Sequence, residues 1–238
     1  MELSKGVRAC GLALHLPAHK TLVLADLHIG IEDAMRREGV LVPRQHYKEV
    51  VRRVTAVLAR CPGIERVVLN GDLKHEFGRI SDQEWREVKR LIDVLRGGGR
   101  EVVIVKGNHD VMLGPIAKDK SVTVVGELKL GDILIVHGDV KPKSLTGIKT
   151  IIIGHEHPTI TLHDKAKAER FKCFLVTNYR FKTLIVQPSF GPLTLGVDVL
   201  RGSFLGPFLG NNVMRGRVFV VDEEKDDVLD FGKAKSLG

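Results

Sequence analysis

The sequence predicts a mixed α/β fold in which two packed mixed β-sheets are flanked by helices. Two observations lead to this prediction. Several short apolar runs rich in β-branched residues each stop at a polar group, and continuous runs of this length are typical of strands buried on both faces. Apolar residues at helical spacing separate the first three runs, whereas short turns separate the later ones. Such a chain buries its apolar faces by stacking sheets and helices in layers.

The first half of the chain is expected to alternate between strands and helices. Strands are predicted at residues 21–25, 67–69 and 102–105. Apolar residues recur at helical spacing between them, first at Val50, Val51, Val54, Val57 and Leu58, and then at Trp85, Val88, Leu91, Ile92 and Leu95. Ser81 and Glu84 form a candidate capping box, and three glycines at residues 97–99 end the second helix. This order implies parallel neighbouring strands over residues 21–110.

The second half is expected to contain strands joined by short turns. Turns at Gly126 and Gly131 predict antiparallel pairing of the strands at residues 122–125, 127–130 and 133–136. Further strands are expected at residues 151–153 and 217–221, together with a hairpin formed by residues 171–177 and 183–186. Residues 202–210 resemble a loop, and residues 223–227 a charged turn.

Composition favours a folded protein without a membrane span. Of the 238 residues, 43% are hydrophobic, which supplies a sizeable core. We expect one domain over residues 1–238, with its motifs at about 20–160 and strands and hairpins at 161–238. The apolar runs are far shorter than the roughly 20 residues of a membrane-spanning helix, and the N-terminus lacks a signal-peptide pattern, so a cytoplasmic location is expected. Cys10, Cys61 and Cys173 have no CxxC spacing and are expected to be buried small hydrophobes.

Polar groups follow five of the predicted strands, and the carboxyl ends of strands in an α/β sheet gather at one edge. These groups are Asp26 and His28, Asp72, Asn108 with His109 and Asp110, His137, and His155 with His157. Asp26 and His28 are two residues apart, so both side chains can point the same way from an extended strand tip. His155 and His157 have the same spacing, with Glu156 facing away. We therefore expect the five groups to converge.

The types of side chain in this set indicate a catalytic metal centre. Imidazole and carboxylate together suit Mn²⁺, Fe or Zn²⁺, and the lack of cysteine argues against a structural thiolate zinc. A bridging aspartate can hold two ions about 3.5–4 Å apart, which is the separation used for in-line displacement at phosphorus. The sequence therefore predicts a two-metal site that hydrolyses phosphoesters.

The ordered motifs resemble those of the calcineurin-like metallophosphoesterases over about residues 20–160. They are Asp26-x-His28, Gly71-Asp72, Gly107-Asn108-His109-Asp110, His137 and Gly154-His155-Glu156-His157. The residues of these motifs, including Lys74-His75 shortly after Gly71-Asp72, resemble the motifs of the SbcD/Mre11 nuclease branch. The whole chain, including Gln187-Pro188-Ser189-Phe190-Gly191, resembles the SbcD/Mre11-related phosphoesterases of archaea and the bacterial ligase-associated phosphoesterases.

This resemblance implies a role for each motif residue. Asp26, His28 and His157 would bind one metal, Asn108, His137 and His155 the second, and Asp72 would bridge them. His109 would contact the substrate phosphate and protonate the leaving oxygen, because imidazole, with a pKa of about 6.5, carries a proton near neutrality. Asp110 would orient His109 or shape its loop. Asn108, His75 and Lys74 are the candidate substrate contacts, and His75 could instead support a metal ligand.

The leading hypothesis is a dinuclear phosphodiesterase that uses hydroxide generated at the metal pair. Mn²⁺ is favoured, with Fe, Zn²⁺ and Ni²⁺ as alternatives, and the net charge of +8 favours nucleic acid as the substrate. A phosphodiesterase or phosphatase for a small molecule or cyclic nucleotide is the first alternative. It arises because about eighty residues follow His157, fewer than the extension that caps DNA in Mre11-type nucleases. A non-catalytic metal-fold scaffold is the second alternative, and His109 argues against it. The oligomeric state is left open.

Overall fold

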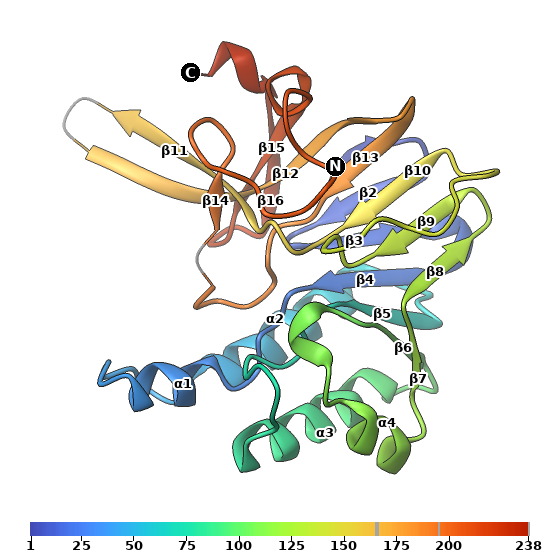
Figure 1. Cartoon of the computed structure of the whole chain (residues 1–238), viewed down its shortest axis with the longest axis vertical. Helices are drawn as coiled ribbons and strands as arrows, with labels where there is room; N and C mark the ends of the chain where they lie inside the picture. The colour runs from blue at the N-terminus through green and yellow to red at the C-terminus, as the bar shows by residue number, and fades with distance from the viewer. Residues whose placement is uncertain (165–166, 195, 238) are drawn as a thin grey trace.

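Two β-sheets face each other, and helices cover one of them on its outer side. The computed structural model describes residues 1–164, 167–194 and 196–237. Figure 1 shows the helices α1–α4 on the side of the first sheet that is turned away from the second sheet. This arrangement confirms the predicted fold class. Among the described residues, no helix has the length and apolar character needed to cross a membrane.

The first sheet contains seven strands in the order in which they occur in the chain. Its antiparallel N-terminal part consists of β1 (Glu2–Ser4), β2 (Val7–Cys10) and β3 (Ala13–Leu16), which the sequence patterns did not predict. The remaining strands are parallel, as expected: β4 (Thr21–Ala25), β5 (Arg66–Asn70), β6 (Glu101–Val105) and β7 (Thr123–Val125). Every residue of β4 is buried, in keeping with its continuous apolar run.

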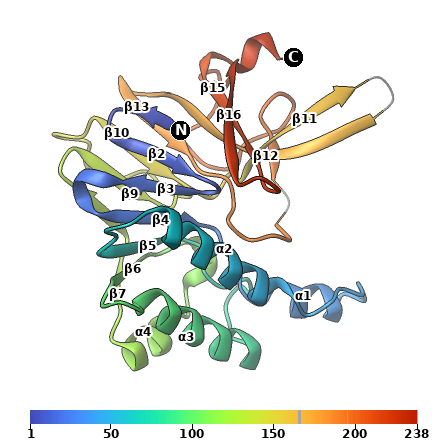
Figure 2. The same ribbon diagram turned by 180° about the vertical axis from the view of Figure 1, so that it is seen from behind.

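The two predicted helices are α2 (His46–Arg60) and α3 (Asp82–Arg96). The capping box is present, because the backbone N–H of Glu84 donates to Ser81 Oγ at 3.2 Å and that of Ser81 donates to Glu84 Oε2 at 2.7 Å. Figure 2 shows α2 and α3 from behind, on the same side of the first sheet. The short helices α1 (Ile31–Arg37) and α4 (Gly114–Lys120) were not predicted. Single-turn 3₁₀ helices lie at Pro17–His19, Asn108–Asp110, Val213–Arg215 and Ala234–Ser236.

The second sheet is built from the later strands. Its order is β14 (Val197–Asp198), β11 (Pro158–Asp164), β12 (Lys167–Tyr179), β13 (Lys182–Val186), β10 (Thr150–Ile153), β9 (Ile133–Val136) and β8 (Glu127–Leu130). The strands β15 (Arg217–Asp222) and β16 (Asp227–Lys233) extend it beyond β12. The predicted hairpin is β12 and β13, which pair antiparallel. The predicted late strand is β15.

One predicted pairing is wrong. The strands before and after Gly126 were expected to pair with each other, but β7 pairs parallel with β6 and β8 pairs antiparallel with β9. Gly126 therefore joins the two sheets. A single residue is shorter than the two-residue loops of tight hairpins, so the chain cannot reverse within one sheet at this point.

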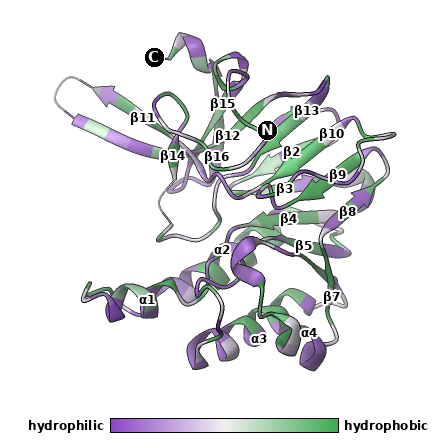
Figure 3. Ribbon diagram, in the orientation of Figure 1, coloured by the Kyte–Doolittle hydropathy of each residue, from purple (hydrophilic) through white to green (hydrophobic). Residues whose placement is uncertain are grey.

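The apolar side chains form two clusters on either side of the second sheet. Ile152 and Ile185 belong to the larger cluster, which also contains side chains from both faces of the first sheet and the buried faces of α2 and α3. Their neighbours Ile151 and Leu184 belong to a second cluster on the opposite face, as the alternation of side chains along a strand requires. Figure 3 shows the corresponding hydrophobic colouring along β9, β10 and β13.

The cysteines are buried or half-buried, but two of them are neighbours. Cys61 and Cys173 are buried and Cys10 is half-buried. The Sγ atoms of Cys10 and Cys61 lie 3.0 Å apart. The spacing along the chain gave no sign of this contact, because it joins the end of β2 to the residue that ends α2.

Candidate metal centre

The loops that follow β4, β5, β6, β9 and β10 bring the predicted polar groups to one place. Asp26 and His28 follow β4, and Asp72 follows β5. His155 follows β10 and donates its backbone N–H to Asp26 Oδ2 at 3.0 Å. This contact joins the two sheets at their strand ends. The site therefore depends on how the sheets pack against each other.

The first group of side chains consists of Asp26, His28 and His157. Each offers a ligand atom, and these atoms all lie within 4.8 Å of one another. The Nε2 atoms of His28 and His157 are 3.4 Å apart, and His157 Nε2 lies 3.3 Å from Asp26 Oδ1. Asp26 and His28 are almost entirely buried. These three residues can hold one cation.

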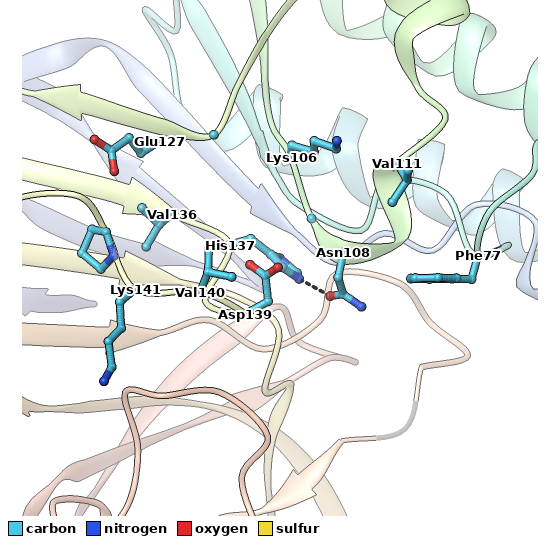
Figure 4. Close-up of a pocket in the computed structure, with 13 residues that line it drawn as sticks. Phe77, Lys106, Asn108, Val111, Glu127, Val136, His137, Asp139, Val140 and Lys141 are labelled. Carbon is cyan, nitrogen blue, oxygen red and sulfur yellow. Dashed lines mark hydrogen bonds between the residues drawn. The ribbon is translucent and has the colours of Figure 1, made fainter.

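The second group consists of Asp72, His137 and His155, whose ligand atoms also lie within 4.8 Å of one another. Asn108 completes it, because its Oδ1 lies 3.0 Å from His137 Nε2 (Figure 4). His155 Nδ1 is 3.2 Å from the same nitrogen of His137. These residues can hold a second cation.

Asp72 lies between the two groups. Its Oδ2 is 3.8 Å from His28 Nε2 in the first group and 3.5 Å from His137 Nε2 in the second. Its Oδ1 accepts the backbone N–H of His109 at 3.0 Å, which fixes the orientation of the carboxylate. One carboxylate can therefore serve both groups.

The buried atoms of the site fit positively charged occupants. Asp26 Oδ1 is buried and has no hydrogen-bond partner among the described residues. Burial first, and then the neighbouring His157, hold the pKa of His28 well below its ordinary value, so its ring is neutral and available to a metal. Burial has the same direction at His137, but the hydrogen bond to Asp72 and the charge of Asp26 outweigh it and raise the pKa of His137 to about 9. The two carboxylates thus favour a cation beside His137.

Five of these side chains come from residues with left-handed backbone conformations. Their φ angles are 53° at Asp26, 48° at His28, 40° at Asp72, 64° at His155 and 42° at His157. The expected extended tips are therefore not present. Asp26 and His28 still face one group, but His155 and His157 face different groups. Positive φ is uncommon outside glycine, costs on the order of 1–3 kcal/mol, and clusters at functional sites.

Two motif glycines make room for these side chains. A Cβ at Gly71, where φ is +76°, would lie 2.0 Å from His137 Nδ1. A Cβ at Gly154 would lie 2.4 Å from Asp26 Oδ2. Neither neighbour can move without leaving its group, so any larger residue at these positions would displace a proposed ligand.

His109 and His75 lie beside the first group. His109 donates from Nδ1 to the carbonyl of His75 at 2.5 Å if its proton is on that nitrogen, and the centroids of the His28 and His109 rings are 5.3 Å apart. His75 Nδ1 lies 3.3 Å from Nδ1 of His28, the ring nitrogen that does not face His157. His75 thus contacts the proposed metal ligand His28. This contact fits the role in support of a metal ligand that the sequence analysis considered for His75.

The buried carboxylate of Asp110 shapes two loops. It accepts the backbone N–H groups of Gly107 at 3.0 Å and Leu73 at 3.1 Å. Burial raises the pKa of the Asp110 carboxyl to about 6, although these hydrogen bonds oppose the shift. Of the two roles expected for Asp110, the structure fits loop shaping, since these loops carry Asp72 and Asn108.

Lys74 does not lie where a substrate could meet it. Its side chain is fully buried, and its ammonium donates to the backbone carbonyl of Glu76. The expected contact between Lys74 and a substrate phosphate is therefore corrected. The backbone at Lys74 forms an isolated parallel bridge with Ile29, in the loop after β4.

The residues that hold the backbone of Asp26 in place were not predicted from the sequence. Ser189 Oγ donates to the backbone carbonyl of Asp26 at 2.6 Å. Lys172, on β12, donates to the carbonyls of Ser189 at 2.8 Å and Gly191 at 2.5 Å. Burial lowers the pKa of Lys172 to about 8. The apolar residues around Lys172 in β12 were the available signal, because a lysine among them must find internal hydrogen-bond acceptors.

A family model and several known proteins are similar to this chain. A family model described as calcineurin-like phosphoesterase matches residues 19–186. The crystal structure of Pseudomonas putida nuclease MPE is similar in fold, with a TM-score of 0.67, 21% identity and coverage of 94% of each chain. The E. coli phosphoesterase YfcE gives a TM-score of 0.40 and 14% identity over 87% of this chain and 95% of that one. Transcription initiation factor IIB of Methanocaldococcus jannaschii is 28% identical over 114 residues, or 48% of this chain but only 14% of that protein's length.

Proposed function

Because the chain belongs to the calcineurin-like phosphoesterase family, we propose that it is a two-metal phosphodiesterase that acts on nucleic acid. Membership makes it a metal-dependent hydrolase of phosphoester bonds. The observation that carries the two-metal proposal is the position of Asp72, whose Oδ2 lies 3.8 Å from His28 Nε2 and 3.5 Å from His137 Nε2. A single carboxylate between two sets of imidazoles is the arrangement that a bridged pair of ions requires.

The proposed ligands fall into the two groups of side chains described above. Asp26, His28 and His157 would hold one ion, and Asn108, His137 and His155 would hold the other. Imidazole and carboxylate ligands suit Mn²⁺, Fe or Zn²⁺, and Mn²⁺ is our proposal. When bound, two such ions polarise the phosphoryl oxygens and activate a water nucleophile near neutral pH.

The chain's own contribution to proton transfer is assigned to His109. The carbonyl of His75 accepts from Nδ1, so Nε2 is the ring nitrogen left to exchange a proton with a substrate. The backbone N–H of His109 donates to Asp72, which ties the ring's position to the bridging carboxylate. We assign His109 Nε2 as the group that protonates the leaving oxygen.

Nucleic acid is favoured as the substrate class by three observations. The net charge is +8, the motif wording resembles the SbcD/Mre11 branch, and the protein of similar fold from Pseudomonas putida is a nuclease. A small nucleotide phosphodiester is the second candidate. It is supported by a cavity of about 460 Å³ beside Asn108 and His137, because pockets of roughly 300–1,000 Å³ hold small molecules.

The decisive experiment replaces Asp72 with asparagine, which keeps the size of the side chain and removes its charge. We expect Asp72→Asn to lower Mn²⁺-dependent hydrolysis of bis-p-nitrophenyl phosphate by at least ~100-fold, as loss of a preorganised electrostatic contact does. Asp119→Asn is the matched control, because Asp119 is exposed and pairs with Lys89 at the surface. Undiminished turnover by Asp72→Asn would sink the proposal.

The substrate class needs a separate panel. Wild-type protein with Mn²⁺ should cleave single-stranded DNA, duplex DNA or RNA. Turnover of small phosphodiesters without any cleavage of these polymers would replace nucleic acid with the small-nucleotide candidate.

A further inference from the structure

A cavity opens directly beside the second group of metal ligands. It has a volume of about 460 Å³, and Asn108 and His137 form part of its wall. Figure 4 shows Phe77 and Val111 on one side of these residues and Val140 on the other. A phosphate held at the metal centre would therefore have this cavity next to it.

Phe77 is the most unusual part of the cavity wall. It is 66% exposed, although it is a large aromatic side chain. Its ring is perpendicular to that of His109, with centroids 5.7 Å apart. An exposed aromatic ring next to the proposed proton donor offers a flat face to a ligand, and stacking of a base on such a ring contributes roughly 1–3 kcal/mol.

Two exposed aliphatic side chains belong to the same cavity. Val140 is 66% exposed and Val111 is 51% exposed. Three exposed apolar side chains in one cavity therefore surround a space next to a polar catalytic site. Exposed apolar side chains that lie together in this way often mark a binding site, whereas single exposed apolar side chains do not.

The cavity wall carries two lysines, Lys106 and Lys141, and two carboxylates, Glu127 and Asp139, so it has no excess of either charge. Figure 4 shows the carboxylate of Asp139 beside the His137 ring and the ammonium of Lys141 directed away from that ring. A second phosphate in the cavity would meet the Asp139 carboxylate, whereas the amino group of a base could donate to it. The cavity thus suits a nucleobase better than a phosphate.

Three arginines of α1 and α2 are paired with carboxylates. Arg37 pairs with Glu76. Arg52 and Arg53 both pair with Glu49 on α2. Because carboxylates neutralise Arg37, Arg52 and Arg53, these three residues offer little charge to the phosphates of a duplex.

We propose that this cavity binds the base of the nucleotide whose phosphate is cleaved, with Phe77 as the stacking platform. This inference rests on the proposed phosphodiesterase function. It identifies the substrate of that function as a nucleotide ester, either a free one or one within a single-stranded nucleic acid. Val111 and Val140 enclose the base, and Asp139 accepts a hydrogen bond from its amino group where one is present.

The test compares two esters with the same leaving group. Thymidine 5′-(p-nitrophenyl phosphate) carries a base, whereas methyl p-nitrophenyl phosphate does not. We expect Phe77→Ala to lower kcat/KM for the thymidine ester 5- to 150-fold more than for the methyl ester, which corresponds to roughly 1–3 kcal/mol of lost stacking. The additional loss for the thymidine ester should appear as a higher KM. Phe77→Trp should restore the preference, and Phe181→Ala, at the fully exposed β12–β13 turn, should leave it unchanged.

The outcomes separate the two proposals. If Phe77→Ala lowers both esters by the same factor, or lowers neither, the base subsite is refuted while the phosphodiesterase function stands. If the wild-type protein hydrolyses neither ester, the proposed function itself fails. Comparing a dinucleotide with a single-stranded oligonucleotide then distinguishes a free nucleotide ester from a polymer, because the preferred substrate has the higher kcat/KM.

Discussion

Gly71→Ala tests whether close approach, rather than backbone conformation alone, explains the glycine before Asp72. The added Cβ would lie 2.0 Å from His137 Nδ1 at a residue whose φ is +76°. Gly63→Ala is a matched control, since its φ is +78° and no atom lies within 4 Å of the added Cβ. Left-handed backbone costs alanine roughly 1–2 kcal/mol at both positions. Overpacking adds roughly 1–3 kcal/mol at Gly71 only.

Urea unfolding of both variants should show this difference as an extra loss of about 1–3 kcal/mol for Gly71→Ala. Calorimetric titration of Mn²⁺ into EDTA-treated protein should show weakened binding in Gly71→Ala and unchanged binding in Gly63→Ala, because only the first change moves a proposed ligand. Equal losses of stability, with unchanged Mn²⁺ binding in both variants, would refute the close-approach argument.

Three further predictions concern groups around the site and the cysteine pair that joins β2 to the end of α2. His75→Phe keeps an aromatic ring but removes the nitrogen beside His28 Nδ1, so Mn²⁺ affinity measured by calorimetry should fall roughly 10- to 100-fold; unchanged affinity would contradict the supporting role. The pKa of Lys172 is lowered from 10.5 to about 8, so folding stability should fall as pH drops from 10.5 through 8. Lys172→Met should remove about 3 kcal/mol of that difference in urea unfolding. A small-molecule disulfide should oxidise Cys10 and Cys61, itself becoming two thiols, and the bond between cysteines 51 positions apart should add about 4 kcal/mol of stability; three titratable thiols remaining after oxidation would exclude it.

The sequence predicted most of the layers because their signal is local. The strand β4 was predicted at its observed limits, Thr21–Ala25, since a continuous apolar run between polar residues needs no tertiary information. The capping box of α3 was predicted for the same reason. The pairing of β7 was not, because the choice between β6 and β8 depends on which edge is available in space.

In the candidate site, too, some features could be predicted from the sequence and others could not. The side chains that converge were chosen from their types and from their place after strands, and the structure brings Asp26, His28 and His157 together. Their left-handed backbones could not be predicted, because no glycine or asparagine marks them. The burial of Lys74 could not be predicted either, since the sequence does not show that its ammonium reaches the backbone carbonyl of Glu76.

Strained ligand residues require support from outside their own loops, and here that support comes from the second sheet. At Asp26 the backbone is left-handed, and its carbonyl is held by Ser189, whose own carbonyl is held by Lys172 of β12. Phe190 adds a backbone hydrogen bond to Ala25, the last residue of β4. A conformation that costs on the order of 1–3 kcal/mol persists only when its surroundings determine it. Residues after His157 therefore support the proposed metal site, because Ser189 and Lys172 hold the backbone of Asp26 in place.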